Sequence, residues 1–184
     1  MADRASTAVC YATEIQPARQ RPLTRKAAAV CMLHIHEDDL SDPQSRRLIS
    51  LHLAGMVADV PPGALFLGLS ELQRPNVTVW SAWDGPRIAS IGALKMLPDG
   101  TGEIKSMRTH PDLIGRGAGA RILATIVDAA KARGIRRLSL ETGSGPSFEA
   151  ARALYEKFGF REGEPYSAYV KTDFNHFLHL QLLD

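Results

Sequence analysis

The chain has 184 residues, of which 45% are hydrophobic and 23% charged, which predicts one globular domain and excludes a disordered or fibrous protein. No run approaches the roughly 18–20 apolar residues of a membrane span, and two cysteines are too few for a disulfide scaffold. The formal net charge of +2 is uneven, because residues 1–31 carry five basic and two acidic side chains and leave residues 32–184 at −1. A body without excess positive charge argues against a nucleic-acid-binding protein.

Residues 1–31 differ from the remainder in pattern. They show no sustained period of 2 or 3.6 and no apolar run after their basic residues, so they match a secretory signal poorly. We expect a disordered N-terminal extension or a natural start at Met32, with an organelle transit peptide as the alternative. Both cysteines, Cys10 and Cys31, lie here. The single domain expected over residues 32–184 therefore has no cysteine nucleophile or cysteine-based zinc site, and a cytoplasmic location suits it.

Four helices are expected from apolar residues at helical spacing. Ser147 is expected to cap the fourth helix at its N-terminus, and Gly134 and Gly159 end the third and the fourth. The apolar stripe of the first helix consists of Leu48, Ile49, Leu51, Leu53 and Met56. The predicted helices cover residues 44–59, 65–73, 117–133 and 147–158.

Six strands are expected from short runs of apolar, β-branched and aromatic residues between Gly and Pro turns. They cover residues 32–36, 77–83, 87–97, 102–109, 136–141 and 174–183. The second to fourth strands follow one another through tight turns, which predicts an antiparallel meander. The strand, helix and strand between residues 102 and 141 predict a right-handed crossover with parallel strands. The expected fold is α/β (α+β), with a mixed, largely antiparallel twisted sheet, one parallel βαβ unit and helices on both faces.

The loop His110–Ala120, between a predicted strand and a predicted helix, carries the most chemical information. Its three glycines within five positions leave the backbone free to approach a ligand. The helix that follows offers unpaired N–H groups and the positive end of its dipole. Together these features predict an anion site suited to a pyrophosphate, to which Arg116 or Arg121 adds a charge-assisted contact.

A dinucleotide-binding module is one interpretation of this loop. Gly115, Gly117 and Ala120 match the fingerprint G-x-G-x-x-G/A, and Glu141 lies about 20 residues further on. The strand before the loop contains charged residues, and the chain after Glu141 is too short for the rest of a doubly wound domain. These features argue against NAD binding, and no Gly-Lys-Ser/Thr sequence follows to make a Walker phosphate loop.

Met107–Ala120, the strand Arg136–Glu141 and the sequence Ala151–Phe160 together resemble the GNAT superfamily of acyl-CoA N-acyltransferases. Residues 102–109, 138–144 and 147–148 resemble a small bacterial N-acetyltransferase subgroup of that superfamily. The resemblance covers residues 77–184 well, with residues 32–76 fitting the family's variable acceptor-side helices. It implies that acetyl-CoA is the co-substrate, its pyrophosphate on the amides of Ile114–Ala120 and its pantetheine arm along the end of the strand at Met107–Thr109. The cofactor-binding residues that it implies are Met107, Arg108, Thr109, Ile114, Gly115, Arg116, Gly117, Ala118, Gly119, Ala120 and Ser147.

Acetyl transfer to an amine needs a base for the amine, donors for the oxyanion and an acid for the departing thiolate. In the family a Tyr at the position of Tyr155 commonly protonates the CoA sulfur, and a core tyrosine with a satisfied hydroxyl is the alternative. Glu103 is the candidate base, acting directly or through water, and a solvated strand-edge charge is the alternative. A main-chain N–H near Met107–Thr109 is the candidate oxyanion donor.

Other polar and aromatic residues leave more than one interpretation open. Arg108 suits an acidic acceptor, a phosphate or a surface ion pair. Trp80 and Trp83 suit an acceptor pocket less well than the core. His34 and His36 share a strand face, but no third His or Cys follows at ligand spacing, so we expect no metal. A further pair, Tyr166 and Tyr169, suggests a lid over the acceptor.

The sequence therefore predicts an acetyl-CoA-dependent N-acetyltransferase that works by direct attack in a ternary complex, because the body has no cysteine to carry the acyl group. A non-catalytic acyl-CoA-binding sensor and a dinucleotide-binding module are the alternatives. The acceptor is a small-molecule or protein amine, whose pocket is expected in residues 32–76 and 161–172. We expect no nucleic-acid or membrane partner; the family often forms homodimers.

Overall fold

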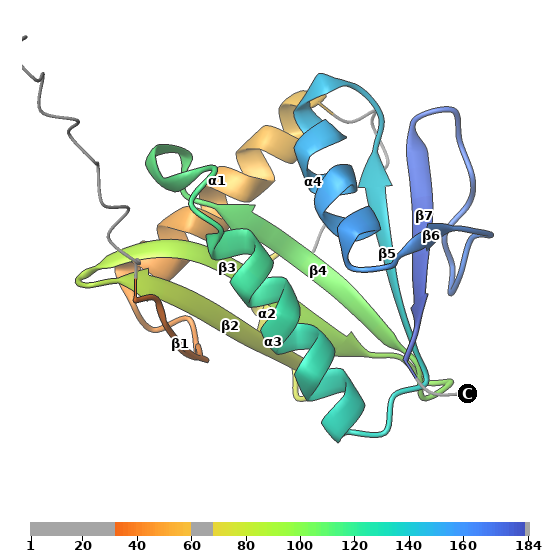
Figure 1. Ribbon diagram of the computed structural model, residues 1–184, viewed down its shortest axis with the longest axis horizontal. Coiled ribbons are helices and arrows are strands. Elements are labelled where there is room, and N and C mark those ends of the chain that lie inside the picture. The colour runs from red at the N-terminus through yellow and green to blue at the C-terminus, as the bar shows by residue number, and fades with distance from the viewer. Residues whose placement is uncertain (1–31, 60–67, 183–184) are drawn as a thin grey trace, which may run out of the picture. The chain divides into compact units, whose positions relative to one another are not determined.

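The computed structural model describes residues 32–59 and 68–182 (Figure 1). The predicted extension over residues 1–31 lies outside the described residues, as do the start of the expected helix 65–73 and the end of the expected strand 174–183. None of the described helices has the length and apolar character needed to cross a membrane.

A seven-stranded mixed sheet forms the centre of the described domain, in the order β1-β2-β3-β4-β5-β7-β6 (Figure 1). Every neighbouring pair is antiparallel except β4 and β5, which run parallel. The strands are β1 (His34–Glu37), β2 (Val77–Asp84), β3 (Arg87–Met96), β4 (Gly102–Thr109), β5 (Arg137–Gly143), β6 (Arg161–Glu162) and β7 (Asn175–Gln181). The predicted meander, the parallel crossover and the mixed sheet are thus confirmed; the short strand β6 was not predicted.

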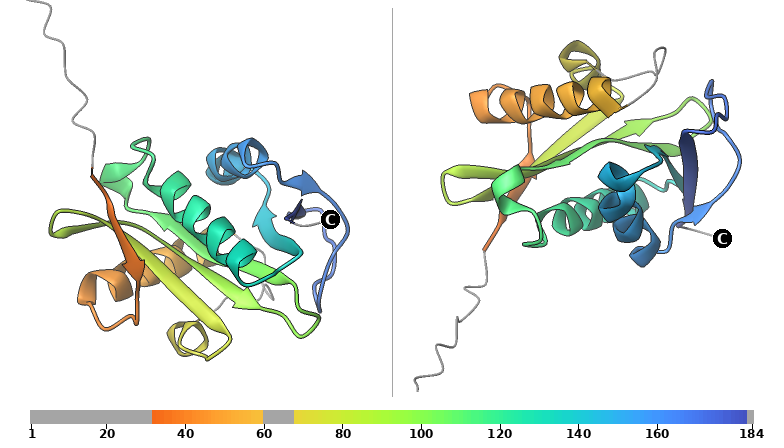
Figure 2. Two further views of the ribbon diagram at one scale, coloured as in Figure 1. Left: turned by 60° about the horizontal axis from the view of Figure 1, so that its bottom comes forward. Right: turned by 90° about the horizontal axis from the view of Figure 1, so that it is seen from above.

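Helices cover both faces of the sheet, as predicted (Figure 2). On one face α1 packs on β3 and β4, and α2 packs on β2; on the other, α3 packs on β2 to β4, and α4 lies by β5. The helices are α1 (Pro43–Asp59), α2 (Leu69–Leu72), α3 (Ala118–Ala132) and α4 (Pro146–Lys157). A single 3₁₀ turn, Pro111–Leu113, precedes α3.

Burial of one apolar face per helix explains the two-sided packing. In α3, Ile122, Leu123 and Ile126 are fully buried against the sheet, in a cluster that also includes Ile104 of β4. A second cluster fixes α1 on the opposite face through Leu48 and Ile49.

Two local predictions are wrong. Leu51 is not on the buried side of α1 but 38% exposed, because at 3.6 residues per turn it lies about 200° around the helix from the buried Ile49. Ser147 does not cap α4: Gly145 is the N-cap residue, and Pro146 takes the first helical position, where its missing N–H costs nothing. The predicted stops are correct, since Gly134 and Gly159 follow α3 and α4 with φ of 70° and 90°.

Candidate active site

The loop between β4 and α3 is shaped by its anchor and two glycines. Leu113, in the 3₁₀ turn, is buried and holds the loop to the body. Gly115 and Gly117 then adopt φ of 78° and 83°, the left-handed region that L side chains rarely occupy. Gly117 is the N-cap residue of α3 and provides no side-chain cap. The helix therefore begins with its N–H groups uncovered.

The amides of this loop are free to bind a ligand. Among the described residues, no backbone or side-chain acceptor pairs with the N–H groups of Gly115 and Gly117, or with those of Ala118 to Ala120 in the first turn of α3. Hydrogen bonds within the chain resume at Arg121, whose N–H donates to the Gly117 carbonyl at 3.1 Å. A row of unpaired donors at the positive end of a helix dipole fits a pyrophosphate.

These amides border a cavity of about 910 Å³, near the upper end of the range for small-molecule sites. Strands β4 and β5 pair only at Gly102–Leu138 and Glu103–Ser139, and beyond these pairs they separate. The cavity is lined by both separated strands, the α3 loop, α4 and part of α1. All the predicted cofactor residues line it except Arg116, which is exposed and lies outside the lining.

A β-bulge at Ser106 decides which side chains of β4 face which helix. Ala93 pairs with Lys105 and Ile91 with Arg108, so Gly92 alone lies opposite both Ser106 and Met107. Ser106 has a φ of 54°, and the side chain of Met107 occupies the space beside Gly92, next to α3. The extra residue breaks the alternation along the strand. Because of it, Lys105 and Arg108, three positions apart, both lie on the α1 face.

Tyr155 of α4 lines the cavity from the α3 side of the sheet. Its ring is 6% exposed and packs edge-on against Phe160, with the ring centroids 5.8 Å apart. The hydroxyl has no hydrogen-bond partner among the described residues. Its oxygen is not fully buried, so the hydroxyl is exposed to the cavity. Burial raises the pKa of the Tyr155 hydroxyl, which therefore stays protonated at neutral pH.

Glu103 is completely buried, so the alternative of a solvated strand-edge charge is wrong. Its Oε1 accepts hydrogen bonds from the hydroxyls of Tyr169 at 2.6 Å and Tyr166 at 3.0 Å. Lys105 Nζ lies 3.4 Å from the same oxygen, and Lys95 Nζ lies 3.6 Å from Oε2. Burial raises the pKa of both tyrosines, followed by the negative charge of Glu103 at Tyr166 and by the hydrogen bond to Glu103 at Tyr169. Glu103 does not line the cavity, whereas Tyr169 and Lys105 do.

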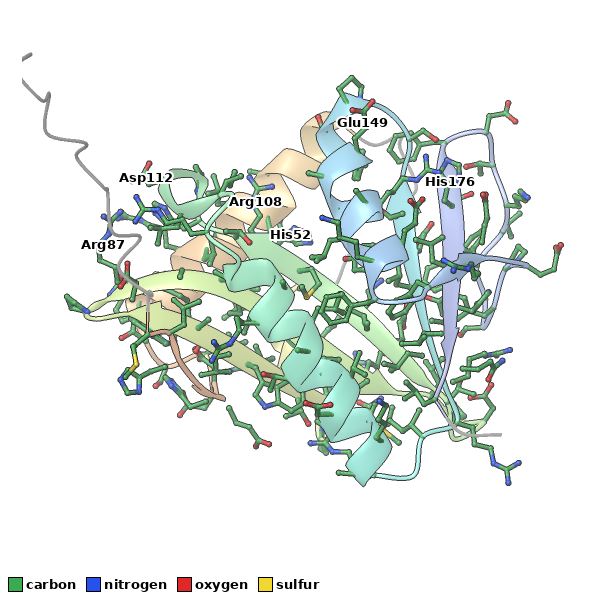
Figure 3. The ribbon with its side chains drawn as sticks, in the orientation of Figure 1. His52, Arg87, Arg108, Asp112, Glu149 and His176 are labelled. Atoms are coloured by element: carbon green, nitrogen blue, oxygen red, sulfur yellow. The ribbon has the colours of Figure 1, made fainter. Side chains whose placement is uncertain are left out.

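His52 of α1 also lines the cavity, and no sequence motif indicates it. Burial, with the positive charges of Arg108 and Lys105, lowers the pKa of His52 to about 4. The side chain is therefore neutral at physiological pH. Figure 3 shows His52 and Arg108 near one another beside α1, and both line the cavity.

Several residues singled out from the sequence lie elsewhere. Trp80 is a core residue and Trp83 packs at the edge of the α1 cluster; neither lines the cavity. His36 stacks on Trp83 with ring centroids 6.1 Å apart. Within residues 32–59 and 68–182, no three His, Cys, Asp or Glu side chains are grouped so as to hold a metal ion.

Comparison with known proteins places this site in a family. The family model described as Acetyltransferase (GNAT) family matches residues 30–160. The chain belongs to the GNAT family. This GNAT protein is therefore an acyltransferase that acts on an amine acceptor, and the dinucleotide-binding interpretation is wrong.

Two relatives are N-acetyltransferases by name. Uncharacterized N-acetyltransferase YedL of Escherichia coli (strain K12) is 42% identical over 154 residues, which cover 83% of this chain and 97% of the relative. Uncharacterized N-acetyltransferase YsnE of Bacillus subtilis (strain 168) is 47% identical over 138 residues, covering 74% and 91%.

Solved structures have the same fold. A Klebsiella pneumoniae protein described as an acyl-CoA N-acyltransferase matches with a TM-score of 0.68 and 23% identity, over 83% of this chain and 99% of that one. A Bacillus subtilis acetyltransferase solved in complex with CoA matches with a TM-score of 0.63 and 19% identity, over 82% and 99%. This GNAT chain thus has the fold on which a relative binds CoA.

Proposed function

We propose that this GNAT enzyme transfers an acetyl group from acetyl-CoA to an amine by direct attack, with both substrates bound together. The observation that carries the proposal is the set of unpaired amides at Gly115 and from Gly117 to Ala120, beside a cavity that continues between β4 and β5. The amides bind the pyrophosphate, and the gap between the strands admits the pantetheine arm and the thioester. Residues 32–184 contain no cysteine to carry the acyl group, which supports direct transfer.

The separated strand supplies main-chain groups to the cofactor. Beyond Glu103, β4 no longer pairs with β5, so main-chain donors and acceptors near Met107 and Thr109 face the gap. Such groups bind the amides of the pantetheine arm in the manner of a sheet edge, and one N–H there stabilises the developing oxyanion. Ser147, at the start of α4, lines the opposite wall.

Tyr155 protonates the departing thiolate. Its hydroxyl opens onto the cavity, and burial keeps it protonated at neutral pH, which is the state that an acid requires. Nucleophilic attack by the amine breaks the carbon–sulfur bond of the thioester, and the hydroxyl proton passes to the sulfur. The enzyme then releases the N-acetyl product and CoA.

Glu103 acts through Tyr169 on the amine side of the reaction. Glu103 is enclosed, and the Tyr169 hydroxyl lies between its carboxylate and the cavity, 2.6 Å from Oε1. Lys105 Nζ donates to the same hydroxyl at 2.9 Å and fixes its orientation. The carboxylate therefore has no direct contact with the substrate. Its hydrogen bond polarises the Tyr169 hydroxyl, whose oxygen accepts the proton of the incoming amine.

Two measurements on the purified protein test the proposal. Saturating CoA should raise the unfolding temperature, with about 2.7 kcal/mol of stabilisation at a ligand concentration 100-fold above Kd, whereas NAD should not. Free-thiol release from acetyl-CoA should accelerate when an amine library is added. CoA binding without amine-dependent thiol release from any acceptor would contradict the proposed reaction, and absence of CoA stabilisation would contradict the cofactor site.

A further inference from the structure

The α1 side of the cavity holds more positive than negative charge. Lys95 and Lys105 share one acid, the buried Glu103. Arg108 has no acidic partner, because among the described residues no carboxylate lies within 4 Å of its guanidinium. Its Nε is also buried without a hydrogen-bond partner in the described chain. A buried, unpartnered guanidinium donor is costly, so a ligand is the natural partner.

Arg108 faces the acceptor side of the cavity and not the cofactor amides. A Cβ built on Gly55 of α1 would lie 3.7 Å from the terminal nitrogen Nη1 of Arg108, so the guanidinium reaches α1. The next residue, Thr109, faces the other way, with its Oγ1 beside Gly119 of α3. The pyrophosphate site at the start of α3 thus lies across the strand from the guanidinium, which leaves Arg108 for the second substrate.

Neighbouring side chains complete a site with one positive and one negative side. Lys105, whose side chain is 12% exposed, lines the same wall as Arg108, and the neutral His52 adds no further charge. Across the cavity, on β5, Glu141 lines the wall and is oriented by Asn175, whose Nδ2 donates to its Oε1 at 2.9 Å. An ammonium group suits the Glu141 wall, and an anionic group suits the Arg108 wall.

We propose that the acceptor is a small amine that also carries a carboxylate, such as an amino acid, and that Arg108 with Lys105 binds this carboxylate. The planar guanidinium matches a carboxylate in two parallel hydrogen bonds, which a lysine cannot make. The inference rests on the proposed function and names its substrate class. Polyamines and amines without an acidic group are then poor acceptors, because they meet uncompensated positive charge.

Matched amines test this substrate class. Thiol release from acetyl-CoA is measured for a series of amino acids, their carboxamides and the corresponding decarboxylated amines. A phosphate arm, O-phosphorylethanolamine, separates a carboxylate site from a general anion site. We expect kcat/KM to be about 10- to 100-fold higher for the carboxylate-bearing member of each pair.

Variants locate the preference. Arg108→Gln should abolish the preference for carboxylate-bearing amines by raising the acceptor KM, whereas Arg108→Lys should retain part of this preference. The matched control is Arg74→Gln, at an exposed position in the turn before β2. This variant should leave kcat and the acceptor KM unchanged. All three variants should keep the wild-type stabilisation by CoA, which shows that they fold.

The outcomes separate the inference from the proposed function. Preference for uncharged or dicationic amines, preference for the phosphate arm, or a carboxylate preference that survives Arg108→Gln would overturn the inference while CoA-dependent transfer stands. If the wild-type protein shows neither stabilisation by CoA nor thiol release, the proposed function is wrong, and the inference with it.

Discussion

The two faces of β4 offer different kinds of contact to a ligand. Toward α3, the site consists of main-chain amides, glycines and apolar side chains around Tyr155. Toward α1, it consists of side-chain charges: Lys105 and Arg108, with the buried Glu103 behind them. Main-chain groups are the same whatever the residue, whereas each charged side chain specifies a partner. The α3 face therefore suits a constant cofactor, and the α1 face suits a particular acceptor.

A single strand serves both faces because of the bulge at Ser106. Without the extra residue, strict alternation would place Met107 beside Lys105 on the α1 face and turn Arg108 toward α3. If the two faces are independent, substitutions on the α3 face change the cofactor and chemical steps, and substitutions on the α1 face change acceptor use and the charge balance.

Tyr155→Phe tests the α3 face with the largest expected effect. The substitution removes only the hydroxyl and retains the packing against Phe160. Loss of a general acid typically lowers the rate by about 10²- to 10⁴-fold, so we expect kcat to fall in that range while the KM for acetyl-CoA stays within a few-fold. Steady-state thiol release measures both constants. Unchanged kcat in a variant that still binds CoA would show that Tyr155 is a core residue only.

Glu103→Gln tests the α1 face. Its carboxylate is the shared acid of Lys95 and Lys105, so we expect the variant to lose about 2–3 kcal/mol of unfolding free energy; partial exposure of Lys95 keeps the loss below that of a fully enclosed pair. Urea denaturation measures this loss, and CoA stabilisation of the folded variant should match the wild type.

Tyr169→Phe distinguishes a relay from a purely structural Glu103. It keeps the carboxylate and both lysines but removes the hydroxyl that connects them to the cavity. We expect a stability loss of about 1 kcal/mol, a fall in kcat and a shifted pH profile. If Tyr169→Phe keeps the wild-type kcat and pH profile, Glu103 has no part in proton transfer.

Gly117→Ala tests the dependence of cofactor binding on backbone shape alone. A methyl group at Gly117 meets no atom within 4 Å, so its cost is the strain of φ 83°, about 1–2 kcal/mol. Relief of that strain rotates the amides, and the CoA Kd should rise about 10-fold while the acceptor KM is unchanged. Gly85→Ala is the matched control, because Gly85 has φ 57° and an equally open surround in the β2–β3 turn. It should lose similar stability without weakening CoA; equal weakening by both would contradict a local role.

The same contrast explains what the sequence could predict. The glycines before α3 and the period of its apolar residues are local signals, so the loop, the crossover and the mixed sheet followed from them. The arrangement of the α1 face depends on pairs far apart in the chain: Glu103 meets Tyr166 and Tyr169 more than sixty residues later. No local pattern shows that Glu103 is enclosed, that Ser106 forms a bulge, or that His52 reaches the cavity.

His52 gives the smallest expected effect and links stability to the charge of the α1 face. Its pKa is about 4 in the folded protein, against an ordinary value of 6.5, so between these values the unfolded chain binds a proton that the folded chain does not. This contribution to stability is fully present above pH 6.5 and is lost as the pH falls toward 4. Between pH 7 and pH 5.5 the loss is about 1 kcal/mol.

Urea denaturation of the wild type and of His52→Gln at both pH values measures this contribution, since glutamine does not titrate. The difference in stability between the two proteins should shift by about 1 kcal/mol in favour of the variant at pH 5.5. High salt should reduce the shift only in part, because burial contributes more to the low pKa than Arg108 and Lys105 do. A shift that disappears in salt would make the two cations the main cause, and no shift at all would contradict a partly buried, neutral histidine on the α1 face.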